Sequence, residues 1–157
     1  MNIENFYSLV AGTCFALVGL WWNVVNGHPD WMDDEHSRHL AGGIYASFLI
    51  PGLMSLAAQI GGDNKLIWRG VFVAAALLGA FFVTRLFLRT RKAGRGLFRR
   101  NQWIVVLLYG IVLLFALFPQ LAEPVNLQPL QVEGILLTLL ILVAHDLTWE
   151  FMTVEKQ

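Results

Sequence analysis

The chain has 157 residues, of which 57% are hydrophobic and only 14% are charged, and its formal net charge is zero. Soluble domains carry about 25% charged residues, so this chain has too few ionised groups to cover the surface of a soluble protein. A net charge of zero also argues against nucleic acid as a partner, which an excess of basic residues would attract. Cys14 is the only cysteine, which excludes an intrachain disulfide and argues against a cysteine-based metal site.

Five apolar runs are long enough to cross a bilayer, since a spanning helix needs about 20 mostly apolar residues. They predict transmembrane helices over residues 6–26, 40–60, 66–88, 103–121 and 127–151. Pro51 lies inside the second run, where it is expected to kink the helix without ending it. The fifth run is the weakest, because Pro129, Gln131 and Glu133 interrupt its start. We therefore expect a single all-α domain over residues 1–157, a bundle of about five transmembrane helices.

The basic residues predict the orientation of this bundle. Seven of the eleven Lys and Arg residues lie between Arg85 and Arg100, in the loop after the third run. Cytoplasmic loops carry an excess of Lys and Arg, so we expect this loop in the cytoplasm, with the N-terminus outside and the C-terminus inside. Only Lys65 and Arg69 then stay on the outer side. The basic loop over residues 89–100 could also bind anionic lipid.

Small residues recur at four-residue spacing in the second and third runs. The pairs are Gly42 with Ala46, Gly43 with Ser47, Gly70 with Ala74, and Ala75 with Gly79. Because small residues let membrane helices approach closely, we expect these two helices to pack against each other along these pairs.

Ionisable residues gather at the predicted cytoplasmic ends of three helices. Such groups are costly at membrane depth and need partners or water, so we expect them to share one membrane level. They are His36 and His39 in the second helix, Arg85 in the third, and His145, Asp146 and Glu150 in the fifth.

Three hypotheses follow for this group. The first is a metal site made by His36, His39, His145 and Asp146, since imidazole and carboxylate suit Zn, Fe, Mn or Cu. The second is haem b held between His39 and His145. The sequence prefers neither cofactor.

The third hypothesis is structural and concerns Arg85. It would pair with Asp146 or Glu150 and so fix the third helix against the fifth, or extend its guanidinium toward the lipid head groups.

Glu133 lies apart from this group, somewhat under two turns inside the predicted outer face. It could pair with Arg69 from the outer end of the third helix, be protonated, or relay a proton. A proton pathway would need a series of polar groups across the membrane, and the fifth helix contains only one such group, Thr138, between Glu133 and the cytoplasmic group.

The run Arg38-His-Leu-Ala-Gly-Gly, followed by an apolar helix of small residues, resembles the second helix of small bacterial DoxX-like membrane proteins. In these proteins an Arg precedes a Gly-Gly pair, an Arg closes the next helix and a Glu opens the last. Arg38, Gly42, Gly43, Arg85 and Glu133 take those places here. The similarity covers roughly the first three helices, and since these relatives usually have four spans, the fourth span would be an insertion. The resemblance implies a protein of the bacterial cytoplasmic (inner) membrane and supplies no activity.

The sequence contains no nucleophile elbow, phosphate-binding loop, Rossmann fingerprint or HExxH pattern. Its loops are too short to form a soluble catalytic domain, and its apolar helices can pack against a partner as easily as against lipid. We therefore expect a non-catalytic polytopic membrane protein that acts as an accessory or assembly subunit of a larger membrane complex. Its partners would be the lipid bilayer and other membrane subunits, or further copies of itself. The alternatives are a metal- or haem-binding redox protein and a small proton-coupled carrier that uses Glu133 and Arg85.

Overall fold

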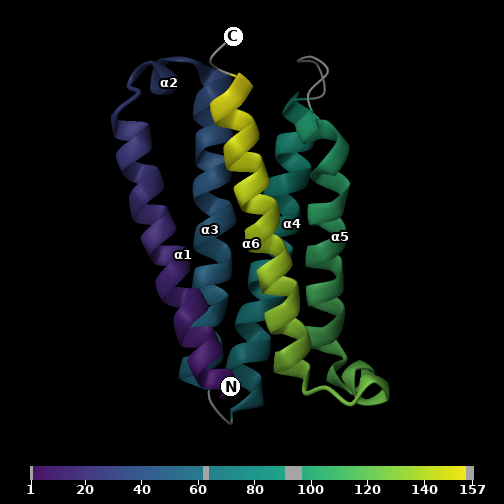
Figure 1. Cartoon of the computed structure of the whole chain (residues 1–157). Helices are drawn as coiled ribbons and strands as arrows, with labels where there is room; N and C mark the ends of the chain where they lie inside the picture. The colour runs from purple at the N-terminus through teal and green to yellow at the C-terminus, as the bar shows by residue number, and fades with distance from the viewer. Residues whose placement is uncertain (1, 62–63, 91–96, 155–157) are drawn as a thin grey trace.

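The computed structural model describes residues 2–61, 64–90 and 97–154. Within these residues the chain is all-α, and its long helices lie side by side as a bundle (Figure 1). The order of elements is α1 (Ile3–Asn26), α2 (Asp30–Asp33), α3 (Glu35–Gly61), α4 (Lys65–Thr90), α5 (Leu97–Leu117), the 3-10 helix η1 (Pro119–Val125) and α6 (Pro129–Val154). The predicted helical bundle is confirmed.

The bundle has two ends and a central helix. We call the end where α1 begins the N-end; η1 and the start of α6 lie there too. The opposite end, the C-end, holds α2, the start of α3 and the end of α6. Helix α3 contacts α1, α4 and α6, while α5 packs on α4 and α6. Helix α1 also contacts α6, so α3 lies at the centre of the bundle.

Four helices of the described chain are long and apolar enough to cross a membrane. They are Ile3–Asn26, Glu35–Gly61, Leu66–Arg85 and Pro129–Thr153. Helix α5 adds a shorter apolar stretch, Trp103–Leu117. Large apolar side chains are exposed on every long helix, which suits contact with lipid and is the composition of an integral membrane protein.

Helix α3 begins at Glu35, five residues before the predicted span. The physical reason is an N-terminal cap, because the Ser37 backbone N–H donates to the Asp34 carboxylate at 2.7 Å. This donation holds the pKa of Asp34 below its usual value. Pro51 lies inside the continuous helix and does not end it, while the expected kink stays a prediction.

The last two spans also differ from their predicted bounds. Helix α5 ends at Leu117 instead of continuing to residue 121, because Pro119 disfavours helical backbone in the residue before it. The chain then forms η1 and passes through Asn126, whose φ is 53°. Helix α6 is regular from Pro129 onward, because proline fits the first turn of a helix, where its missing N–H needs no partner.

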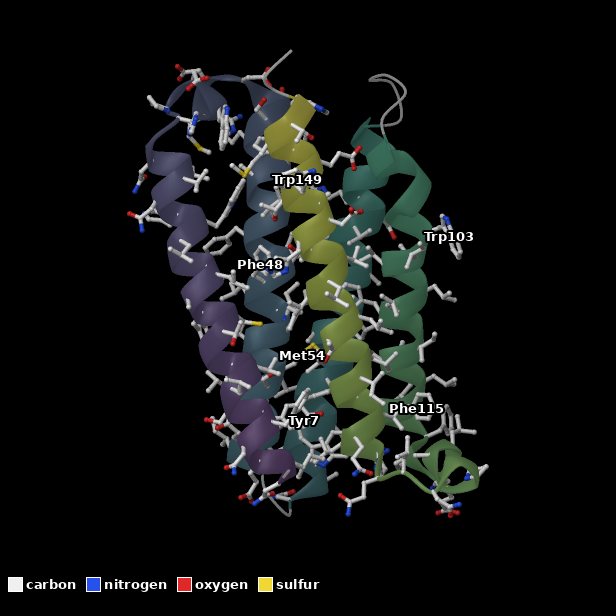
Figure 2. All side chains as sticks on the ribbon, viewed as in Figure 1. Tyr7, Phe48, Met54, Trp103, Phe115 and Trp149 are labelled. Carbon is white, nitrogen blue, oxygen red and sulfur yellow. The ribbon has the colours of Figure 1, made fainter. Side chains whose placement is uncertain are left out.

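The interior contains two hydrophobic clusters. The larger one joins all five long helices and includes Tyr7, Met54, Phe72 and Leu137. Figure 2 shows Tyr7 near the N-end and Met54 nearer the middle. The second cluster lies toward the C-end between α1, α2, α3 and α6, around Trp21, Trp31, Phe48 and Phe151.

Candidate functional site

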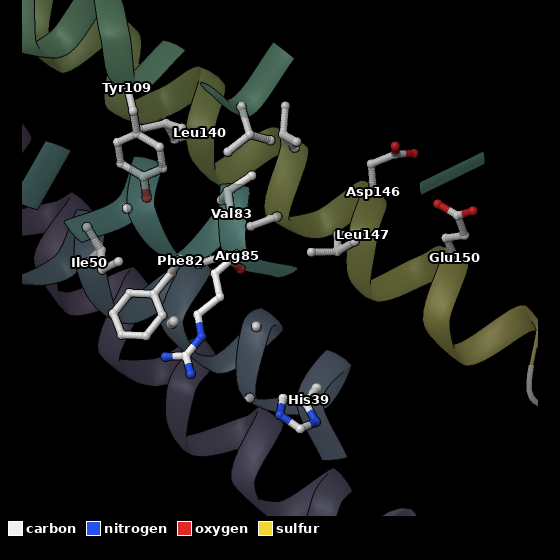
Figure 3. Close-up of a pocket in the computed structure, with 18 of the residues that line it drawn as sticks. His39, Ile50, Phe82, Val83, Arg85, Tyr109, Leu140, Asp146, Leu147 and Glu150 are labelled. Atoms are coloured by element: carbon white, nitrogen blue, oxygen red, sulfur yellow. The ribbon is translucent and has the colours of Figure 1, made fainter. Parts of the chain in front are cut away.

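A cavity of about 540 Å³ lies toward the C-end, between α3, α4, α5 and α6 (Figure 3). Binding sites for small molecules usually measure about 300–1,000 Å³, so this cavity is large enough to hold one. Its lining residues are Arg38, His39, Gly42, Gly43, Ala46, Ser47 and Ile50 from α3, Gly79, Phe82, Val83 and Arg85 from α4, Val105 and Tyr109 from α5, and Leu140, Val143, Ala144, Asp146, Leu147 and Glu150 from α6.

The cavity exists because small residues face it. A Cβ placed on Gly42 would meet no atom within 4 Å, so the α3 backbone borders open space there. Gly79 has the opposite surroundings, since a Cβ on it would overlap the ring of Tyr109. The buried Tyr109 side chain therefore lies directly against the α4 backbone, and Figure 3 shows it extending from α5 into the cavity.

The residues that were predicted to pack α3 against α4 have several different surroundings. Helices α3 and α4 do contact each other, but Gly42, Gly43, Ala46 and Ser47 line the cavity. Gly70 of α4 has no atom within 4 Å of an added Cβ, and Ala74 is exposed. Ala75 is half-buried and packs against the larger cluster. An added Cβ on Gly42 or Gly70 would therefore meet no neighbour, and the packing of α3 on α4 along the four pairs stays a prediction.

Charged groups are confined to one part of the lining. Arg38 and His39 come from the start of α3, Arg85 from the end of α4, and Asp146 and Glu150 from the end of α6. These positions all lie toward the C-end, which we call the mouth of the cavity. The rest of the lining is almost entirely apolar, with Ile50, Phe82, Val83 and Leu140 among its larger side chains.

The structure thus brings together several of the ionisable residues that the sequence singled out. Figure 3 shows that the Arg85 guanidinium extends toward the side of the cavity where His39 lies. Asp146 and Glu150 lie on α6, on the opposite side of this view. Arg85 points away from both carboxylates in this view. The predicted ion pairs of Arg85 receive no support from this arrangement and stay predictions.

The three histidines of the predicted metal and haem sites have different surroundings. His39 lines the cavity, and its Nδ1 lies 2.6 Å from the Glu35 carbonyl oxygen. His145 is outside the lining; its Nδ1 lies 2.9 Å from the Ile141 carbonyl oxygen, and its ring meets Phe48 edge-on at 5.2 Å between centroids. His36 is exposed.

Among the described residues, no three His, Cys, Asp or Glu side chains come together in a group that could hold a metal ion. The metal and haem hypotheses therefore gain no geometric support, and they stay predictions.

At the N-end, Arg69 and Glu133 have separate surroundings. Arg69 donates from Nε to the Ala116 carbonyl at 2.7 Å and from Nη2 to the Leu117 carbonyl at 2.8 Å. It therefore caps the last carbonyls of α5, which carry partial negative charge. Both carboxyl oxygens of Glu133 are buried and have no hydrogen-bond partner among the described residues. In this structure Arg69 thus stabilises the end of α5, and the expected contact with Glu133 is not formed.

Sequence reasoning missed the apolar part of the site. Tyr109, Phe82 and Leu140 resemble any other apolar residue of a membrane helix, and nothing in their spacing marks them as cavity residues. The run from Gly42 to Ser47 was a signal, since small residues permit either close helix contact or open space. The basic loop over residues 89–100, which was predicted to lie in the cytoplasm and could also bind anionic lipid, has its side chains outside the described residues.

No protein-family model matches this chain, and comparisons with curated proteins and with solved structures gave no match. Nothing in these comparisons bears on the DoxX-like resemblance, which stays a prediction. The functional evidence for this chain is therefore its own fold and cavity.

Proposed function

We propose that this protein is a non-catalytic membrane protein that binds an amphipathic molecule with an anionic group in the cavity between α3, α4, α5 and α6. One observation supports the proposal: the cavity has an apolar interior and a charged mouth. An amphipathic molecule has the same division, so its apolar part would contact Ile50, Phe82 and Leu140 while its polar group stays at the mouth. Burial of the apolar part would contribute about 25 cal/mol per Å² removed from water.

Arg85 would hold the anionic group of the ligand. A guanidinium offers five donors in a planar arrangement that matches carboxylate and phosphate oxygens. Arg85 lies at the mouth and is exposed, so a ligand could reach it without displacing a packed side chain. Arg38 is a second cation of the mouth; its Nη1 makes one long hydrogen bond, 3.3 Å, to the Met32 carbonyl. The mouth also carries Asp146 and Glu150, so the preference for an anionic group rests on the Arg85 guanidinium, which points away from both carboxylates in Figure 3.

We also propose that the mouth faces the cytoplasmic leaflet of a bacterial inner membrane. The excess of Lys and Arg between Arg85 and Arg100 supports this orientation. So does the exposure of Trp22, Trp103 and Trp149 toward the C-end, because tryptophan favours the boundary between lipid and water. The ligand would then enter from the inner leaflet. A subunit that retains such a molecule fits the accessory role in a membrane complex expected from the sequence.

The experiment uses two matched glycine variants of the full chain, purified from its native membrane in mild detergent. Gly42→Leu places a side chain in the cavity, whereas Gly70→Leu places one on α4 outside the lining. Neither added Cβ meets an atom within 4 Å, so both variants should fold. We expect native mass spectrometry to find one amphipathic anion per chain in the wild type and in Gly70→Leu. Gly42→Leu should retain at least about tenfold less, which is a binding change of about 1.4 kcal/mol.

A second pair of variants tests the charge. Arg85→Gln should lower retention of the anion, and Arg85→Lys should retain most of it. Equal amounts of bound molecule in the wild type, Gly42→Leu and Arg85→Gln would disprove the site. The same preparation tests the other hypotheses. A second polypeptide that co-purifies in stoichiometric amount supports the accessory role. Bound metal or a Soret absorption band that is lost in His145→Ala supports the redox alternative.

A further inference from the structure

The second unusual feature of the molecule lies at its other end and concerns Glu133. Its side chain is 0% exposed, in the first turns of α6. Neither carboxyl oxygen has a hydrogen-bond partner among the described residues. Glu133 is four residues from the start of α6, about 6 Å along the helix at 1.5 Å per residue. A carboxyl group is therefore buried close to one aqueous boundary.

Among the residues that the structure describes, the groups that could neutralise Glu133 have other partners. The Tyr7 hydroxyl of α1 donates to the Leu130 carbonyl at 2.6 Å. Arg69 of α4 donates to the two carbonyls at the end of α5. The acids Glu4 and Glu123 are exposed. No charged or titratable side chain described at this end supplies a donor to Glu133.

The space around Glu133 is closely packed. A Cβ on the next residue, Gly134, would lie 2.8 Å from the ring of Phe6, so α1 and α6 approach closely here. Tyr7, Phe72 and Leu137 belong to the larger hydrophobic cluster in this part of the bundle. An ionised carboxylate without a partner is very costly in apolar surroundings, and such groups take up a proton instead. Ionisable residues inside membrane segments commonly mark proton relays.

We propose that Glu133 is a proton-binding site that exchanges its proton with the aqueous phase at the N-end of the bundle. Protonated Glu133 fits between α1 and α6 as a neutral group. Release of the proton leaves a charge in the hydrophobic cluster, so it requires water or movement of α1 away from α6. This site is separate from the cavity, since Glu133 is absent from its lining, and it does not depend on the ligand proposed there.

Dicyclohexylcarbodiimide tests the proposal, because this lipid-soluble reagent reacts with protonated carboxyl groups. The carboxyl proton passes to a carbodiimide nitrogen, the oxygen bonds to the central carbon, and rearrangement gives a stable N-acylurea. The full chain is treated in membrane vesicles at several pH values, and adducts are counted by intact-protein mass. We expect one adduct per chain, lost in Glu133→Gln, retained in Glu123→Gln and decreasing as the pH rises. Glu123 is the matched control because it is an exposed acid near the same end.

Three outcomes would overturn the proposal. The first is a wild-type chain that remains unlabelled at every pH, and the second is an adduct that persists in Glu133→Gln. The third is protection by sodium ions at constant pH, which would mean that the site binds Na⁺. Thermal unfolding in detergent gives an independent check, since Glu133→Gln exchanges one neutral group for another and should keep the Tm of the wild type at low pH. A large fall in Tm there would indicate an ionised, partnered Glu133 and would also overturn the proposal.

Discussion

The two faces of α3 near the C-end differ in how completely they are filled. On the face toward α1, Ile44 packs with the buried Trp21 and Trp31 in a dense aromatic cluster. On the other face, Gly42 and Ala46 border a cavity of about 540 Å³. Both faces lie at similar depth on the same helix and contain apolar residues. The comparison shows that side-chain volume, rather than polarity, distinguishes the closely packed face of α3 from the face that borders the cavity.

The filled face is held by directional contacts as well as by volume. The Trp21 Nε1 donates to the Ala41 carbonyl of α3 at 3.0 Å. Trp31 stacks on His28 with 4.2 Å between ring centroids and meets Phe151 edge-on at 4.8 Å. Because Trp31 also stacks on Trp21 of α1, with 6.1 Å between ring centroids, short helix α2 is fixed to both α1 and α6. The other face is bordered instead by the small residues Gly42 and Ala46, so the two faces should respond to substitution in opposite ways.

The largest effect is expected on the filled face. Trp21→Ala removes the most deeply placed indole of the aromatic cluster and its hydrogen bond, and should lower the free energy of unfolding by about 3–5 kcal/mol. Trp22→Ala is the control, because Trp22 is 58% exposed and Trp21 only 4%. Unfolding by denaturant in detergent measures both. Equal losses of unfolding free energy in the two variants would show that packing in the aromatic cluster does not stabilise the protein.

A smaller difference in stability is expected between alanine substitutions of two glycines that both line the cavity. Gly79→Ala should destabilise the protein by about 1–3 kcal/mol, because the new methyl group would overlap the Tyr109 ring. Gly42→Ala should leave stability unchanged or raise it by up to about 1 kcal/mol, since alanine favours helix and meets no neighbour there. Thermal unfolding in detergent compares them. A destabilised Gly42→Ala variant would mean that the face is already filled.

The smallest effect is expected at the start of α3, outside the membrane-spanning segment. The pKa of Asp34 is lowered chiefly because the Ser37 backbone N–H donates to its carboxylate. The folded state therefore binds this proton less readily than the unfolded state. The stabilisation is fully present above the ordinary Asp pKa and is lost as the pH falls through the lower folded-state pKa. Asp34→Ala should slightly lower the Tm at neutral pH and have no effect in strong acid. A Tm difference that persists in strong acid would contradict this explanation.

Part of the fold and of the site could be read from residue patterns. The uncharged stretches predicted the long helices, because length and hydrophobicity alone decide whether a helix can span. The sequence predicted that six ionisable residues share one level. Four of them, His39, Arg85, Asp146 and Glu150, line the mouth, whereas His36 and His145 are outside the lining. The contacts of Arg69 could not be predicted in this way, because the α5 carbonyls that it caps are exposed only where Pro119 ends that helix.

The sequence by itself determined that this chain is a bundle of apolar helices, because twenty apolar residues in a row have few other stable arrangements. Only the tertiary structure decided that Gly42 faces open space while Gly79 lies against Tyr109. The same holds for the burial of both Glu133 carboxyl oxygens with no hydrogen-bond partner among the described residues. Helix-forming residues specify an axis and a set of faces, but the rotation of each helix and its distance from its neighbours follow from packing across the whole bundle. These variables decide where the cavity and the buried carboxyl group lie.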